Sequence, residues 1–313
     1  MTTVTDPAEA PFGIVVDKAQ EHPRSWRKLK DASLAYALLL PAGVIFAVFI
    51  FYPFLKNFDL ALHRTNPFNP DLSEYVGLEQ FGDVLGSKEF FDSLWTTILF
   101  AIMTVPVGIA LGLGLAVLAH QKLKGIAIFR TIFSSTVATS VAVAAVMFYT
   151  LFNPNIGLLK SVSPTPPFLE NPDWALISIA IVTIWQSLGL SFILMSAGLQ
   201  AIPDELVEAA QVDGAGPWSR FRNVTLPLLS PTMFFAIVVG TIFAFQTFGQ
   251  IDILTEGGPL KKTNVLTYFI FTELRVQRNP GTAAVLAIAL FAITLVLTLV
   301  QLRLLERRVH YQR

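Results

Sequence analysis

Long apolar runs alternate with short polar segments along most of this chain of 313 residues. A helix needs about 20 mostly apolar residues to cross the hydrocarbon core of a bilayer. Six runs are long and apolar enough, and they cover residues 33–54, 93–119, 127–152, 175–199, 227–250 and 282–302. The pattern therefore predicts an all-α integral membrane protein with six transmembrane helices.

Two further segments lie outside these predicted spans. Residues 1–30 carry many charges and several prolines without a helical period, so we expect a mobile cytoplasmic tail before a six-span domain at residues 31–313. Residues 264–271 are apolar but too few to cross a bilayer, and they predict an interfacial or re-entrant helix on the outer side.

The distribution of Lys and Arg predicts the orientation of the spans. Basic residues flank four segments that would share one side: Arg24, Arg27, Lys28, Lys30, Lys122, Lys124, Arg130, Arg220, Arg222, Arg303, Arg307 and Arg308. The first loop on the other side is mainly acidic, although Lys261, Lys262, Arg275 and Arg278 in the last such loop oppose the trend. Because cytoplasmic loops are enriched in Lys and Arg, both termini are predicted to be cytoplasmic in a plasma membrane.

Composition excludes several other classes of protein. With 53% hydrophobic and 14% charged residues, the chain is too apolar for an ordinary soluble domain. Its formal net charge is zero, so no basic surface indicates nucleic-acid binding. It contains no cysteine, and its four histidines are far apart in sequence, so we expect no metal site.

The polar segment at residues 203–227, between the fourth and fifth predicted spans, carries a detailed pattern. Pro203 followed by Asp204 and Glu205 suits the start of a helix, where carboxylates face the positive end of the dipole. A Gly-rich turn at residues 214–217 then separates two short helices. An amphipathic helix–turn–helix of this kind could be an ordinary connector, but it looks like a docking element.

Seven residues of this segment stand at a characteristic spacing: Glu208, Ala209, Ala210, Gly214, Val224, Leu226 and Pro227. Their spacing resembles the EAA loop of bacterial ABC importer permeases, which usually has Ile at the position of Val224. In the family this loop forms a coupling helix that lies in a cleft of the ATP-hydrolysing subunit. The resemblance therefore implies that Glu208, Ala209, Ala210, Asp213, Gly214, Leu226 and Pro227 couple the chain to that subunit.

Shorter matches extend the resemblance over most of the chain. Residues 76–81, 153–157, 201–203 and 257–259 are similar to the sugar-type branch of the family. Residues 66–68, 95–97 and 309–312 are similar to the branch that imports glycerol-3-phosphate and glycerophosphodiesters such as glycerophosphocholine. The transport of trehalose, maltose or another oligosaccharide is the alternative.

Membership of this family would imply a type I importer permease fold and a set of partners. These are a second six-span permease in a heterodimer, two ATP-binding subunits and an extracytoplasmic solute-binding protein, working by alternating access. The chain has no G-x-x-x-x-G-K-[ST] loop, so ATP and Mg²⁺ are expected on the partner and no cofactor or catalytic residue in this chain. An ion-coupled secondary transporter would need buried ionisable groups, and an intramembrane enzyme a catalytic constellation; neither is visible.

Polar side chains within the spans are candidates for a substrate path, because burial in lipid is costly. They are Asn153, Gln186, Ser187, Gln246, Thr247 and Gln250. Hydrogen bonding between helices is the alternative for each of them. No Lys or Arg lies in the middle of a predicted span. A phosphate-bearing solute would thus have to find its ionic ligand on another subunit, or be recognised before entry.

Overall fold

A computed structural model describes residues 36–66, 69–121, 124–153, 157 and 168–306. The chain divides into two units, Met1–Leu55 and Lys56–Arg313, and each is considered by itself. The tail predicted at residues 1–30 lies outside the described residues. The described part of the first unit belongs to an apolar helix, Tyr36–Ala61, which includes the π-helix η1 (Ala47–Phe51) and continues into α2 (Tyr52–Ala61).

The described residues contain four helices long and apolar enough to cross a membrane: Tyr36–Ala61, Lys88–Ala119, Ala175–Gln200 and Pro280–Leu304. The number rises to six if each of two bent helix pairs is one span, namely Ile126–Ala138 with Val141–Phe152 and Pro217–Leu228 with Ser230–Phe245. The predicted pattern of spans is therefore confirmed in part, because two of the expected continuous helices are broken.

The third predicted span is not one helix. It consists of α5 (Ile126–Ser134), the 3₁₀ helix η2 (Ser135–Ala138) and α6 (Val141–Phe152), with a bend of 104°. The hydroxyls of Ser134, Ser135 and Thr136 donate back to carbonyls of the preceding turn. Such bonds compete with regular helix continuation, and the Ser140 side chain then caps α6 by accepting from Val143 N.

The fifth predicted span, residues 227–250, is also interrupted. It begins with α10 (Leu226–Leu228), bends by 65° into α11 (Ser230–Phe245), and resumes as the short helix α12 (Gly249–Leu254). Pro231 in the first turn of α11 lacks the N–H that would continue the preceding helix, which explains the bend. Phe248, with φ −135° and ψ −59°, separates α11 from α12.

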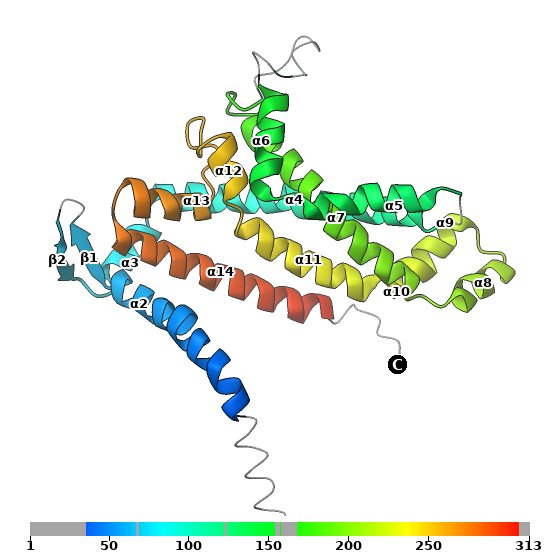
Figure 1. The fold of residues 1–313 in the computed structure, drawn as a ribbon, viewed down its shortest axis with the longest axis horizontal. Coiled ribbons are helices and arrows are strands. Elements are labelled where there is room, and N and C mark those ends of the chain that lie inside the picture. Colours follow the sequence, from blue (N-terminus) through cyan, green and yellow to red (C-terminus); the bar gives the residue numbers. More distant parts are fainter. Residues whose placement is uncertain (1–35, 67–68, 122–123, 154–156, 158–167, 307–313) are drawn as a thin grey trace, which may run out of the picture. The chain divides into compact units, whose positions relative to one another are not determined.

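Within the second unit, α4 (Lys88–Ala119) packs along α7 (Ala175–Gln200) and α11, and α14 (Pro280–Glu306) lies beside α11 (Figure 1). Glycine permits the closest contact between α4 and α7. A Cβ at Gly112 would lie 2.5 Å from Ser191 Cβ, far closer than two carbons can approach. These long helices form the frame on which the shorter elements are placed.

Helix α6 runs across the direction of these long helices and packs against α12 (Figure 1). An apolar cluster holds the two short helices together with the start of α7. It includes Phe152 from α6, Ile179 from α7 and Ile251 from α12, the last two with no exposed surface. The third and fifth predicted spans therefore meet where α6 packs against α12.

A two-stranded antiparallel hairpin corrects the all-α prediction. Its strands are β1 (His63–Asn66) and β2 (Asn69–Tyr75), with His63 opposite Tyr75. The strands are short and polar, so they show none of the apolar alternation that predicts a half-buried strand. Arg64 of β1 donates to Asp83 of α3 (Glu79–Leu85) at 2.6 Å, which joins the hairpin to the next helix.

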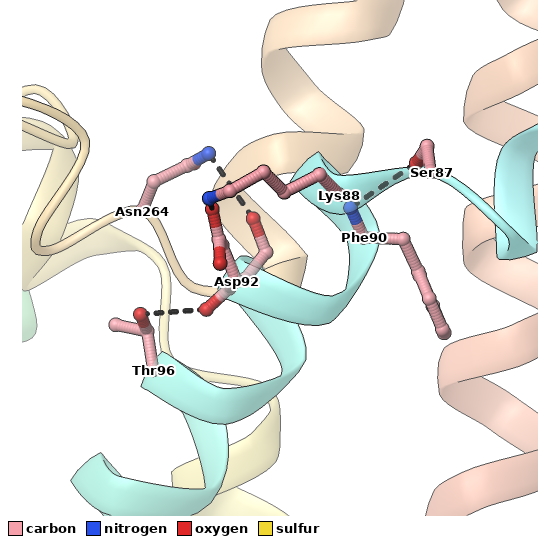
Figure 2. A network of polar contacts seen from close by, with 7 residues as sticks. Ser87, Lys88, Phe90, Asp92, Thr96 and Asn264 are labelled. Atoms are coloured by element: carbon pink, nitrogen blue, oxygen red, sulfur yellow. Dashed lines mark hydrogen bonds and ion pairs between the residues drawn. The ribbon is translucent and has the colours of Figure 1, made fainter.

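The short helix expected at residues 264–271 is present as α13 (Leu266–Phe271), followed by the π-helix η5 (Thr272–Val276). Its start is attached to the first turns of α4 (Figure 2). Asn264 donates to Ser93 Oγ at 3.2 Å, and Leu266 N donates to Thr97 Oγ1 at 2.8 Å. Both side chains of α4 are buried, so this attachment is sheltered from water.

Candidate functional site

The predicted docking segment consists of α8 (Asp204–Val212), α9 (Pro217–Arg220) and the π-helix η4 (Phe221–Thr225). Pro203 has extended backbone angles and precedes the first helical residue, so α8 begins at Asp204. Asp204 and Glu205 occupy its first turn, where negative charge is stabilised by the free N–H groups. The helix–turn–helix predicted from sequence is therefore present.

Backbone hydrogen bonds close the turn after α8 around Gly214. Gly214 N donates to Gln211 O at 3.1 Å, and Ala215 N donates to Ala210 O at 3.0 Å. This pair of bonds is the Schellman motif, which requires a left-handed residue at the position of Gly214. Gly214 has φ +82°, a conformation that costs other residues about 1 kcal/mol or more.

No other segment among the described residues covers most of the surface of the docking segment. Of the residues predicted to couple, Glu208, Ala209, Asp213 and Gly214 are exposed, whereas Ala210, Leu226 and Pro227 are half-buried. Val212 is 87% exposed and Trp218 is 71% exposed. Arg220 donates to Gln211 Oε1 at 2.6 Å and so ties the second helix back to the first. The segment is a firmly closed turn that presents apolar and acidic side chains outward.

A cavity of about 520 Å³ lies where the break between η2 and α6 faces the break between α11 and α12. Its walls come from the middle of α4 and α7, the second half of α11, the start of α12 and residues 136–141 between η2 and α6. Five predicted path residues line it: Gln186, Ser187, Gln246, Thr247 and Gln250. Asn153 lies at the end of α6 and is not among the lining residues, so its place on a path stays a prediction.

The amides in the cavity wall differ in their bonding. Gln250 Nε2 donates to Gln186 Oε1 at 2.8 Å, and Gln186 Nε2 donates to Thr139 O at 3.2 Å. These two hydrogen bonds link α12, α7 and the η2–α6 break, as expected for bonding between helices, and a role of Gln186 and Gln250 in a substrate path stays a prediction. Gln246 is exposed, and its amide has no hydrogen-bond partner among the described residues.

Sequence reasoning missed four of the hydroxyls that line the cavity. They belong to Thr104, Thr136, Thr139 and Ser191. A signal for part of this set was available, because Thr183, Ser187 and Ser191 follow at intervals of four residues and so share one face of α7. Thr183 Oγ1 is buried without a hydrogen-bond partner in the described structure.

The cavity wall contains no ionisable side chain among the described residues that form it. Its polar groups are amides and hydroxyls, which suit neutral hydrogen-bonding solutes. No group of three or more His, Asp or Glu residues in the described ranges is placed to hold a metal ion.

The sequence profile of the family described as "Binding-protein-dependent transport system inner membrane component" matches residues 80–311. The chain belongs to this family. Together with its long apolar helices, this membership makes it a multi-pass inner-membrane transport protein. The family resemblance inferred from the docking segment is thereby confirmed.

Similar proteins within the family are named as permeases of one transport system. The chain is 36% identical to the sn-glycerol-3-phosphate transport system permease protein UgpA of Yersinia enterocolitica over 284 residues, covering 89% of this chain and 96% of that protein. It is 35% identical to UgpA of Agrobacterium fabrum over 283 residues, with the same coverage of 89% and 96%.

Solved structures with a similar fold are ABC importers. One is a bacterial transporter involved in the import of the acidic polysaccharide alginate, with a TM-score of 0.78, 23% identity and coverage of 91% of this chain and 99% of that chain. A second structure, of the alginate transporter with a pentasaccharide-bound periplasmic protein, gives a TM-score of 0.79 at 22% identity, covering 91% of this chain and 98% of that chain. At these identities the likeness concerns the fold alone.

Proposed function

We propose that this chain is a permease subunit of an ATP-driven importer of glycerol-3-phosphate or glycerophosphodiesters. The observation that carries the proposal is the similarity to UgpA proteins, which covers 89% of this chain and 96% of each of those proteins. In this proposal the six spans are the four long helices, the bent pair Ile126–Ala138 with Val141–Phe152, and residues 227–250, with both termini and the docking segment in the cytoplasm. The chain itself performs no catalysis.

The proposed partners follow from the family and from the exposed docking segment. A second six-span permease completes a heterodimer, two ATP-binding subunits carry ATP and Mg²⁺, and an extracytoplasmic binding protein delivers the solute. The residues proposed to contact an ATP-binding subunit are Glu208, Ala209, Ala210, Asp213, Gly214, Leu226 and Pro227. Exposed apolar groups such as Val212 and Trp218 support this assignment, since a partner would remove them from water.

The connection between the docking segment and the cavity supports alternating access. Helix α8 leads through α9, η4 and α10 directly into α11, whose second half forms one wall of the cavity. A displacement of the docking segment by ATP-driven closure would therefore be passed along one continuous stretch of backbone. The cavity wall would then move relative to α4 and α7, opening the path to alternate sides.

The test is ATP hydrolysis in liposomes by the complex of this chain with its second permease, ATP-binding subunits and binding protein. Glycerophosphocholine, glycerol-3-phosphate, trehalose and maltose would be offered in turn. Stimulation by the two glycerophosphate compounds alone is expected. Stimulation by a disaccharide alone would refute the proposed substrate, and failure of the ATP-binding subunits to co-purify would refute the proposed coupling.

A further inference from the structure

The cavity combines unsatisfied hydrogen-bonding capacity with an absence of charge. Gln246 presents an exposed amide that can both donate and accept. The Thr139 hydroxyl, at the η2–α6 break, likewise has no hydrogen-bond partner among the described residues. Both residues line the same cavity, one at the end of α11 and the other at the break between η2 and α6. Groups of this kind match the hydroxyls of a polyol.

The same wall is unsuited to a phosphate group. A phosphate that leaves water needs cationic or multiple charge-assisted donors, and an ionised group without them carries a desolvation penalty of several kcal/mol. Two cations of the described residues illustrate this: Arg130 donates to Ala119 O at the end of α4, and Lys261 lies in the exposed connection between α12 and α13. Neither residue lines the cavity.

We propose that this chain binds the hydroxyl-bearing glycerol end of the solute through Gln246 and Thr139, and that it makes no contact with the phosphate. This inference rests on the proposed import of glycerophosphates, and it assigns to one subunit the recognition of the uncharged part of the solute. The phosphate then faces away from this chain, toward the other half of the path. Gln186 and Gln250 position the walls, because a hydrogen bond between their amides joins α7 to α12.

The test compares how one substitution changes the affinity for four small probes. The complex of this chain with its second permease and ATP-binding subunits is titrated without binding protein, and binding is followed by saturation-transfer NMR. The probes are sn-glycerol-3-phosphate, glycerol, propyl phosphate and inorganic phosphate. Binding of inorganic phosphate is measured by its displacement of propyl phosphate. Gln246→Leu is expected to lower the affinity of the complex for glycerol-3-phosphate and for glycerol about fivefold to tenfold. This is the effect of losing one or two neutral hydrogen bonds. The affinities for propyl phosphate and inorganic phosphate should not change.

Matched controls separate recognition from folding. Gln301→Leu removes an amide that donates to Thr241 Oγ1, and Thr150→Val removes a hydroxyl that donates to Val146 O; both residues lie outside the cavity. Neither control should alter the affinity for any probe. Thr139→Val should resemble Gln246→Leu, with a smaller effect on the glycerol-bearing probes only.

Three outcomes would overturn the inference. In the first, Gln246→Leu lowers the affinity for all four probes equally; in the second, it lowers the affinity for none of them. In the third, the wild-type complex imports glycerol-3-phosphate but shows no saturation transfer to the glycerol protons of that probe. Uptake by the wild-type complex in liposomes, measured first with binding protein, distinguishes this failure from that of the proposed function. A complex that takes up no glycerophosphate refutes the proposed function, and the inference that rests on it.

Discussion

The docking segment contains two glycines with open space around them but different backbone conformations. Gly214 has φ +82° and Gly216 has φ −66°, and a Cβ at either position would meet no atom within 4 Å. A substitution at Gly214 is therefore disfavoured by its backbone alone, whereas Gly216 can accept a side chain without strain. This pair isolates the conformational requirement of the turn.

Gly214→Ala should uncouple ATP hydrolysis from transport while the chain still inserts into the membrane. The left-handed conformation would cost alanine about 1 kcal/mol, so the Schellman turn would relax and the surface offered to the ATP-binding subunit would change. Transport and ATP hydrolysis are measured together in liposomes. Gly216→Ala is the control and should be close to wild type; equal transport by both variants would contradict the requirement for a left-handed turn.

Glu273 of η5, outside the candidate spans, gives a prediction of pH dependence. Burial raises the pKa of this half-buried carboxyl above 4.5; Lys261 opposes the shift and Glu89 adds to it. A raised folded-state pKa means that the folded protein binds the proton more tightly than the unfolded chain does. Its contribution to stability is therefore complete below pH 4.5 and is lost as the pH rises through the raised pKa.

Glu273→Gln should accordingly raise the thermal stability of the protein in detergent at neutral pH and leave it unchanged near pH 4. The unfolding temperature of variant and wild type is compared across that range. The effect should be modest, since the carboxyl is only half-buried. A variant that is less stable than wild type at neutral pH would show that the charged carboxylate has a favourable partner instead.

At the scale of elements, the contact between α4 and α7 depends on the glycine spacing of α4. Gly112 faces Ser191 of α7 at a distance that excludes a side chain, whereas a Cβ at Gly114 would meet no atom within 4 Å. Both glycines lie in one helix, so any change in helix propensity is nearly the same for both. They differ only in what they face.

Gly112→Ala should lower the unfolding temperature in detergent by several degrees, because the added methyl group forces α4 and α7 apart and overpacking costs about 1–3 kcal/mol. Gly114→Ala should be neutral or slightly stabilising. Circular dichroism melts of the two purified variants provide the measurement. Equal destabilisation by both would show that the α4–α7 contact is looser than the structure indicates.

The sequence predicted long helices well and broken helices badly, for a physical reason. Helix α7 and the predicted span at residues 175–199 agree closely, because a long apolar run without proline or adjacent hydroxyls has one stable conformation in lipid. The third and fifth spans are equally apolar, but their course is decided by Ser134 to Thr136 and by Pro231. Hydropathy averages over a window and is blind to such local hydrogen bonding.

The residues that line the cavity could be predicted from the sequence only in part. Five of the six proposed path residues line one cavity, but only tertiary packing decides that Gln186 and Gln250 bond to each other while Gln246 remains open. The position of a glutamine in the sequence does not show whether its amide is bonded to another residue of the chain. The turn at Gly214, by contrast, is governed by local bonds within six residues, so its pattern was recognisable before the structure.

At the scale of the whole molecule, the orientation of the chain can be tested by cysteine labelling, because the natural sequence contains no cysteine. Leu78 is 74% exposed near the hairpin, and Val212 is 87% exposed in the docking segment. In cells that lack the ATP-binding subunits, a membrane-impermeant maleimide should label Leu78→Cys from outside. Val212→Cys should be labelled only in inverted vesicles, and adding the ATP-binding subunits should protect it. Labelling of both residues from the same side would contradict the proposed topology.

The closed turn of the docking segment also bears on the speed of assembly. Its backbone bonds and the Arg220–Gln211 contact fix its shape in the isolated chain. A preorganised surface loses little conformational entropy on association, so a partner need not wait for the segment to fold. Docking would then proceed as a rigid-body encounter, with a rate set by diffusion and orientation. A subunit that must follow every ATP cycle without delay gains from a contact that is already in its final form.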